Sequence, residues 1–164
     1  PGSPAASPRG ASGSCPVSGF QPLAGSGRCP CGGGARRLSY AACCAPLHRL
    51  EQQALTAEQL MRSRYSAFAL GEVDHLLRTQ PSDEPEDARR RALLETCRQV
   101  RWQRLEILAT EAGGPTDRIG TVTFRAHYRQ GSVRGVMQER SRFGRRGESL
   151  EGDWLYLEAL ELLA

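Results

Sequence analysis

The chain has 164 residues, 39% of them hydrophobic, which suits one small domain with a short appendage. Its basic residues are 22 arginines against 18 acidic residues, which gives a net charge of +4. Because lysine and asparagine are both absent, a GC-rich genome accounts for the arginine content, which is therefore weak evidence for nucleic-acid binding. No apolar run approaches the roughly 18 residues of a membrane span, and residues 1–14 lack the apolar segment of a signal peptide. We therefore expect a cytoplasmic protein.

Residues 1–27 are rich in glycine, proline, alanine and serine and contain few apolar residues. Such a composition predicts a disordered tail. Cys15 lies in this tail, where we expect a free thiol rather than a metal ligand.

The next segment concentrates four cysteines in sixteen residues, at Cys29, Cys31, Cys43 and Cys44. Four thiolates at close range form a closed tetrahedral zinc site, and the glycines after Cys31 allow a tight turn beneath the ion. A segment this short cannot fold on buried apolar surface alone, whereas zinc supplies roughly 10–16 kcal/mol of apparent free energy. The pattern predicts a structural Zn²⁺ knuckle over residues 28–50, because four thiolates leave no open position for catalysis.

Two other arrangements of this segment stay open. The first is disulfide pairing between the two groups of cysteines, although nothing in the sequence indicates an oxidising compartment. The second is replacement of one cysteine ligand by His48, which lies four residues after Cys44. Without that role, His48 is an ordinary surface or capping histidine.

Charge is unevenly distributed along the chain. Residues 1–50 carry five arginines and no acidic residue, whereas residues 51–164 carry 17 arginines and 18 acidic residues. The knuckle is therefore the basic part. We expect Arg36, Arg37 and Arg49 to form a basic patch that docks a partner protein. RNA is a weaker alternative partner, because few aromatic residues accompany these arginines.

Apolar residues of helical period first appear between residues 57 and 70. Thr56 caps this predicted helix, and Gln59, three residues later, completes a capping box. Gly71 ends the helix, since glycine readily takes the left-handed conformation found after a helix C-terminus.

Two further helices are predicted. The second covers residues 72–79, with its apolar residues inward and His75 on its exposed side. The third begins at Pro85 or Glu86 and runs through Cys97, which we expect to be buried and inert.

Beyond residue 100 the apolar residues alternate instead. Glycine-rich turns separate four predicted strands, over residues 101–110, 119–128, 133–143 and 153–163. About three helices followed by a four-stranded antiparallel meander form an α+β fold, with the helices over one curved face of the sheet. On the first strand, strict alternation places Leu105 and Ile107 opposite Trp102.

On the third strand, Glu139 shares a face with Met137 and Phe143, so it points into the core if they do. A buried carboxylate needs a partner, and Arg64 on the first helix is the candidate. We favour a structural ion pair between helix and sheet. The alternative is a ligand pocket or general-base site with Glu139, Arg64 and Tyr65 in its wall. The sequence contains no recognisable catalytic triad, which argues against an enzyme.

Several strings of the chain resemble a bacterial family, the YchJ-like proteins. They are Cys29-Pro30-Cys31-Gly32, Tyr40-Ala41-Ala42-Cys43-Cys44, Glu139-Arg140-Ser141-Arg142-Phe143 and the specific string Leu60-Met61-Arg62-Ser63-Arg64-Tyr65. The cysteine segment is similar to the SEC-C motif, a zinc motif also found at the C-terminus of the SecA translocation motor. The resemblance implies a nuclear-transport-factor-2-like (cystatin-like) cone over residues 55–164 behind a SEC-C-type knuckle. It also implies a protein partner of the chaperone, translocation or ribosome-associated class.

The chain departs from the family pattern in two places near these strings. The loop of eleven residues between Cys31 and Cys43 is longer than is usual in the family. Gln80-Pro81 stands where His-Pro is common. Glycine in the longer loop can absorb the insertion, so we expect the four ligands to survive.

The sequence therefore predicts a zinc-binding protein of undetermined activity. The leading interpretation is a binding or adaptor module that docks a protein partner through the basic knuckle. The alternative is a small-ligand binder or enzyme that uses the cone cavity around Glu139. A second alternative is RNA or ribosome binding.

Overall fold

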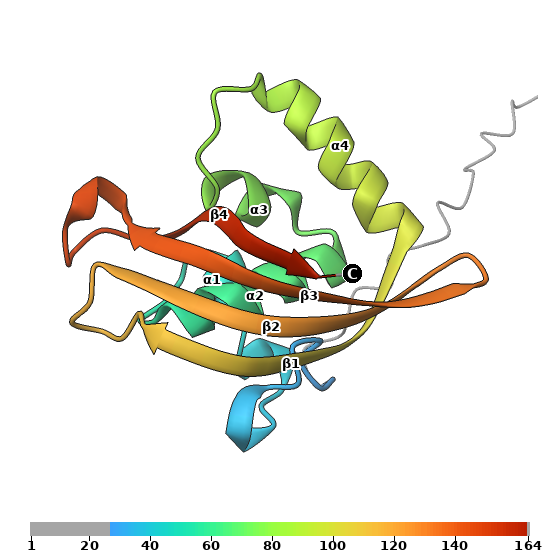
Figure 1. The fold of residues 1–164 in the computed structure, drawn as a ribbon, viewed down its shortest axis with the longest axis horizontal. Helices are drawn as coiled ribbons and strands as arrows, with labels where there is room; N and C mark the ends of the chain where they lie inside the picture. Colours follow the sequence, from blue (N-terminus) through green and yellow to red (C-terminus); the bar gives the residue numbers. More distant parts are fainter. Residues whose placement is uncertain (1–26, 164) are drawn as a thin grey trace, which may run out of the picture.

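The computed structural model describes residues 27–163, in which helices lie against the inner side of a curved antiparallel sheet (Figure 1). The disordered tail was predicted over residues 1–27, and all of it except Gly27, with the Cys15 thiol, lies outside the described part of the chain. The knuckle contains the 3₁₀ turns η1 (Gly34–Arg36) and η2 (Tyr40–Ala42) and the short helix α1 (Ala45–His48). The predicted α+β cone behind a knuckle is confirmed.

Helix α2 (Ala57–Leu70) begins and ends at the predicted residues. The backbone N–H of Gln59 donates to the Thr56 hydroxyl at 3.1 Å, and the Gln59 side-chain oxygen accepts from the N–H of Leu55 at 2.7 Å. Gly71 follows with a φ of 77°, the left-handed conformation that its lack of a Cβ permits. The helix is buried on several sides, because it lies between the knuckle and the sheet.

Helices α3 (Val73–Arg78) and α4 (Glu86–Gln99) also match the prediction closely. Cys97 near the end of α4 is 9% exposed and packs in a small cluster with α2 and α3, so its predicted burial is confirmed. None of the helices in residues 27–163 combines the length and the apolar character that a membrane crossing requires.

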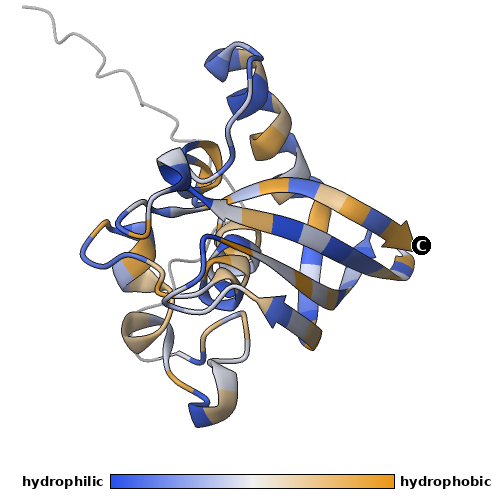
Figure 2. Cartoon of the chain, turned by 60° about the vertical axis from the view of Figure 1, so that its left-hand side comes forward, coloured by the Kyte–Doolittle hydropathy of each residue, from blue (hydrophilic) through white to orange (hydrophobic). Residues whose placement is uncertain are grey.

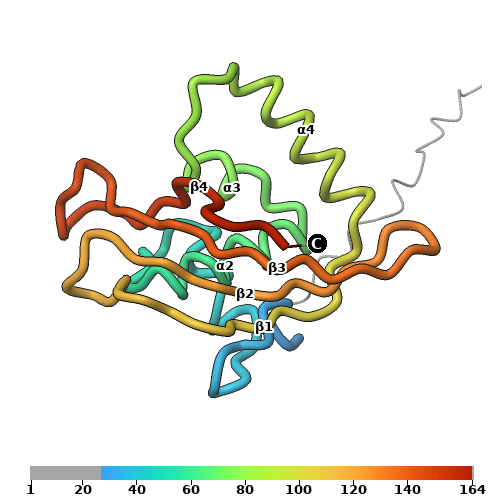
Figure 3. Tube along the Cα trace, viewed as in Figure 1, coloured from blue at the N-terminus to red at the C-terminus, as the bar shows by residue number. Residues whose placement is uncertain are grey.

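Strands β1 (Val100–Ala112), β2 (Ile119–Gln130), β3 (Val133–Arg145) and β4 (Trp154–Leu163) follow one another across the sheet in chain order, as Figure 3 traces. Apolar and polar residues alternate along them (Figure 2). The inner positions pack against helix α2, and the outer face carries ion pairs such as Arg142 with Glu158 at 3.0 Å. The inner, concave face is therefore where a buried site can form.

One detail of β1 corrects the sequence analysis. Trp102 pairs with Tyr128, and Leu105 pairs with Ala126. Two residues of β1 therefore lie between these pairs, where β2 has only one. This β-bulge places Trp102 on the same, inner side as Leu105, and both pack against the core. Strict alternation was wrong here because a bulge shifts the phase of every residue that follows it.

The knuckle and the cone share one hydrophobic core. Cys29 and Leu47 of the knuckle belong to the same buried cluster as Leu60 of α2 and as Phe143 and Trp154 of the sheet. Helix α2 is the element that lies between them and contributes to both.

Candidate functional site

The four knuckle cysteines converge on one point. Their Sγ atoms all lie within 4.8 Å of one another. The Cys31 sulfur is 3.5 Å from those of Cys29 and Cys43, and the Cys44 sulfur is 3.7 Å from those of Cys31 and Cys43. A tetrahedron with metal–sulfur bonds of ~2.3 Å has edges of about 3.8 Å, whereas a disulfide bond is only ~2.05 Å long. The arrangement therefore fits one tetrahedral metal ion, despite the longer loop between Cys31 and Cys43, and contains no disulfide.

Electrostatics in the cluster also favour a cation. The neighbouring thiols, Cys31 first, lower the pKa of the Cys29 thiol, whereas interaction with Cys29 raises the pKa of the Cys44 thiol far above its usual range. Four sulfurs this close, three of them on buried residues, cannot all ionise unless a positive ion compensates their charge.

Backbone and helix groups support the cluster from outside. The N–H of Gly33 donates to the Cys31 sulfur at 3.4 Å, and the Ser66 hydroxyl of α2 is 3.4 Å from the Cys29 sulfur. Gly33 has a φ of 72°, and a Cβ there would lie 2.2 Å from the backbone nitrogen of Leu38. The glycine is therefore required by this turn.

His48 is neither a ligand of the cluster nor a surface residue, so both sequence interpretations of it were wrong. It is 7% exposed, and its Nε2 is 2.8 Å from the carbonyl oxygen of Ser63. Because a carbonyl only accepts, Nε2 carries the proton, and Nδ1 accepts from the Tyr40 hydroxyl at 2.8 Å. His48 thus ties the knuckle to helix α2.

His75 was predicted to be exposed, and it is 3% exposed. Its Nδ1 accepts from Arg78 at 2.8 Å, and its Nε2 is 2.8 Å from the Ser63 hydroxyl, which itself donates to the carbonyl of Leu60. Burial, followed by the neighbouring His48 and Arg78, lowers the pKa of His75 to about 2. The ring is therefore neutral in the folded protein. The sequence could not show that its partner would be Ser63 of α2.

We expect this neutral histidine to make the fold sensitive to acid. The unfolded chain binds a proton at His75 below a pKa of about 6.5, whereas the folded chain does not until the pH reaches about 2. The contribution of His75 to the free energy of unfolding is complete above the pKa of the unfolded chain. Below that pKa it is lost as the pH falls, by up to ~1.4 kcal/mol per pH unit.

Urea unfolding at successive pH values, for the wild type and for His75→Gln, measures this effect. The variant should show a shallower loss of stability below a pH of about 6.5. Protonation of the cysteines affects both proteins alike, so equal slopes would contradict the assignment.

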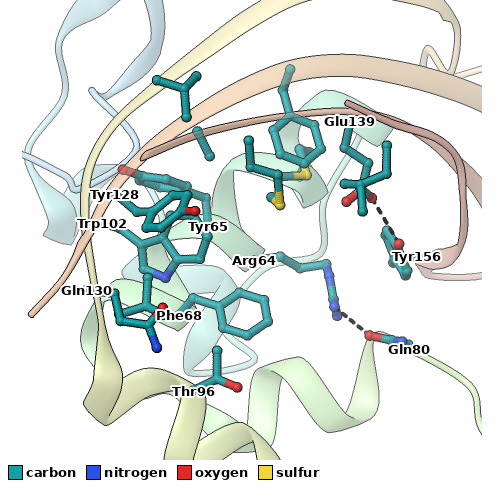
Figure 4. Close-up of a pocket in the computed structure, with 17 residues that line it drawn as sticks. Arg64, Tyr65, Phe68, Gln80, Thr96, Trp102, Tyr128, Gln130, Glu139 and Tyr156 are labelled. Atoms are coloured by element: carbon teal, nitrogen blue, oxygen red, sulfur yellow. Dashed lines mark hydrogen bonds between the residues drawn. The ribbon is translucent and has the colours of Figure 1, made fainter. Parts of the chain in front are cut away.

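A cavity of about 530 Å³ lies inside the cone, between α2, the end of α4 and the concave face of the sheet (Figure 4). Its wall is mostly apolar, with residues such as Met61, Phe68, Trp102, Phe124, Met137 and Leu162. The three residues predicted for a ligand pocket, Arg64, Tyr65 and Glu139, all line it.

The predicted ion pair between Arg64 and Glu139 is not formed. Arg64, 4% exposed, donates to the carbonyl of Leu76 at 3.1 Å, to Thr79 Oγ1 at 2.7 Å and to Gln80 Oε1 at 2.7 Å. Burial lowers the pKa of its guanidinium to about 10. Neutral acceptors at the end of α3 thus hold the side chain.

Tyr156, which the sequence analysis missed, lies between these two charged groups. The Arg64 guanidinium stands 4.9 Å from the centroid of the Tyr156 ring. Glu139 Oε1 accepts from the Tyr156 hydroxyl at 2.9 Å and from the Ser141 hydroxyl at 2.6 Å. Figure 4 shows Arg64 extended toward Gln80, with Tyr156 beside Glu139.

The opposite end of the cavity is aromatic, and two of the residues that line it have a buried polar atom without a partner. The Tyr65 hydroxyl and the Trp102 Nε1 are both buried, and neither forms a hydrogen bond with any described residue. The two rings meet edge to face with centroids 5.8 Å apart, and Tyr128 flanks Trp102 (Figure 4). Buried polar groups are nearly always paired, so these two indicate a missing partner. The sequence gives no sign of Trp102 as a site residue, because its inward direction depends on the bulge.

The basic patch stays a prediction. Arg36, Arg37 and Arg49 are all exposed on the knuckle, as docking would require.

The profile of the family described as YchJ, middle NTF2-like domain, matches residues 56–159. The chain belongs to the YchJ-like family. A UPF0225 protein of Corynebacterium efficiens is 45% identical to this YchJ-like chain over 129 residues, which cover 79% of the chain and 89% of the relative. A UPF0225 protein of Streptomyces coelicolor is also 45% identical, over 131 residues that cover 79% and 92%.

Two solved structures share the fold of this YchJ-like chain. A SEC-C motif containing protein from Rhodopseudomonas palustris superposes with a TM-score of 0.65 and 29% identity, covering 80% of the chain and 96% of that protein. A SEC-C motif containing protein from Psychrobacter arcticus gives a TM-score of 0.63 and 25% identity, covering 84% of each. The predicted family resemblance and the nuclear-transport-factor-2-like cone are therefore confirmed.

Proposed function

We propose that this protein binds a small molecule in the cone cavity and uses the knuckle as a structural Zn²⁺ centre. The observation that carries the binding proposal is that two residues of the cavity wall have a buried polar group without a partner, the Tyr65 hydroxyl and the Trp102 indole N–H. A buried polar group left unsatisfied costs about 1–3 kcal/mol. A bound ligand that hydrogen-bonds to both groups removes this cost.

The size and lining of the cavity support the same function. Small-molecule sites are concave, mostly apolar, about 300–1,000 Å³ in volume, and contain a few polar groups that orient the ligand. The cavity of about 530 Å³ has this character, with Arg64 and Glu139 as its charged groups.

Cys29, Cys31, Cys43 and Cys44 would hold the zinc ion. With all four positions occupied by sulfur, the ion would supply folding free energy and no open position for a substrate. Helix α2 links the two sites, because Ser66 contacts Cys29 on one side of the helix while Tyr65 lines the cavity on another. We therefore assign the knuckle the role of fixing the cavity wall.

The binding proposal is tested by filling the cavity. Ala126 is 1% exposed and lines the cavity on β2, so Ala126→Leu should obstruct it, whereas Ala109→Leu on neighbouring β1 adds the same atoms at an exposed position. We expect a naphthalene probe such as 2-acetyl-6-hydroxynaphthalene to bind the wild type and Ala109→Leu with one-to-one stoichiometry.

Ala126→Leu should weaken binding of the probe by about tenfold or more, because a leucine occupies space that the ring needs. Isothermal titration calorimetry measures both stoichiometry and affinity. Unchanged affinity in Ala126→Leu, or no binding by the wild type, would contradict the proposal.

A further inference from the structure

The aromatic end of the cavity offers donors. The Trp102 indole N–H can only donate a hydrogen bond. Burial raises the pKa of Tyr65, so its hydroxyl keeps its proton and is available as a second donor. Both residues line the same cavity, and their rings are in contact. A ligand that satisfies this end must therefore present an acceptor, such as a carbonyl oxygen.

The charged end of the cavity offers an acceptor. Glu139 uses Oε1 for both of its hydrogen bonds, from Ser141 and from Tyr156. Among residues 27–163 no donor reaches Glu139 Oε2. A carboxylate only accepts, and Glu139 is half-buried, so this oxygen can take an O–H or N–H donor from a ligand. Arg64 does not provide it, because its hydrogen bonds go to Leu76, Thr79 and Gln80.

The two charged side chains in the wall, Arg64 and Glu139, have opposite signs. The tyrosines that line the cavity have raised pKa values where a shift is resolved, at Tyr65 and Tyr156, and so remain neutral. The two charges in the cavity wall therefore sum to zero, which favours a ligand without net charge.

Resting on the proposed function, we infer that the ligand is a neutral, ring-bearing molecule with two polar ends. A hydrogen-bond acceptor at one end meets Tyr65 and Trp102. A neutral hydroxyl or amide N–H donor at the other end meets Glu139. The rings and methionine side chains of the wall cover the apolar body between them.

Three naphthalenes test this polarity on the zinc-loaded full chain. 2-Acetyl-6-hydroxynaphthalene carries both groups, 2-acetylnaphthalene lacks the donor, and 2-ethyl-6-hydroxynaphthalene lacks the acceptor. We expect each single deletion to weaken binding by about tenfold, because it leaves one end of the cavity unsatisfied. Calorimetry gives the three affinities.

Two variants assign each end. In Tyr65→Phe, the gain in affinity that the acetyl group provides should fall to about threefold. The gain in affinity that the hydroxyl group provides should stay near tenfold. Glu139→Gln keeps an acceptor for Ser141 and Tyr156. In this variant, only the gain in affinity that the hydroxyl group provides should fall. Each variant is thus the matched control for the other.

The indole N–H resonances provide an independent readout. The chain has two tryptophans, and the Trp154 N–H already donates to the carbonyl of Leu55 at 3.2 Å. Binding of either acetyl probe should move the Trp102 N–H signal to lower field and leave that of Trp154 in place.

The outcomes separate the two proposals. The inferred polarity would be overturned if all three naphthalenes bound with equal affinity. It would also be overturned if both variants lost the gain in affinity from the same ligand group. Either result would leave cavity binding intact. Failure of all three to bind would overturn the proposed function itself.

Discussion

Replacement of Cys44 by serine is expected to abolish zinc binding and to destabilise the whole of the described fold. Cys44 is 1% exposed, and its sulfur is 3.7 Å from those of Cys31 and Cys43. Structural zinc supplies roughly 10–16 kcal/mol in small zinc peptides, whereas a whole domain is stable by only about 5–15 kcal/mol. Because the knuckle shares its core with the cone, the loss should not stay confined to the knuckle.

Elemental analysis and thermal unfolding measure this prediction together. The wild type should contain one zinc ion per chain, and Cys44→Ser should contain none and unfold at a much lower temperature. Cys97→Ser is the matched control, since Cys97 is buried but lies outside the cysteine cluster. It should retain its zinc. A wild type without stoichiometric metal, or a Cys44→Ser variant that keeps it, would refute the zinc centre.

Phe143→Ala should greatly lower the free energy of unfolding. Phe143 is 0% exposed on β3, and its ring meets that of Tyr156 edge to face with centroids 5.7 Å apart. Truncation of a buried phenylalanine costs about 3–5 kcal/mol, because it removes buried apolar surface and leaves a cavity. The edge-to-face contact adds to the loss.

Urea unfolding with zinc present gives the free energy of unfolding for this variant. Val133→Ala lies on the same strand at a position 62% exposed, so its stability should remain within about 0.5 kcal/mol of the wild type. A difference of less than about 1 kcal/mol between the two variants would show that Phe143 does not have the packing described here.

The helices and strands were predictable because their signals are local. Thr56 and Gln59 satisfy backbone groups only a few residues away, and Gly71 supplies a conformation that other residues avoid. Alternation along β2 and β3 reflects which face of the sheet is buried. The bulge at Trp102 broke this rule in β1, because the phase of a strand also depends on its neighbour.

The polar part of the cavity was only partly predictable. The inward direction of Glu139 followed from its place between Met137 and Phe143, and all three contact the interior or line the cavity. The hydrogen-bond partner of Glu139 could not be predicted from the sequence. Tyr156 comes from β4 and donates to Glu139 across the β3–β4 pair, while Arg64 is held by Leu76 of α3 and by Gln80 just beyond it.

Spacing and periodicity along the chain were enough to specify the order of helices and strands and the convergence of four cysteines, because both depend on residues close in sequence. Packing decided which buried polar groups are satisfied. His48 and His75 both find partners on Ser63, whereas the Tyr65 hydroxyl and the Trp102 N–H find none among the described residues. The partner of a buried polar group comes from whichever distant segment is folded against it, and no local pattern in the chain records that contact.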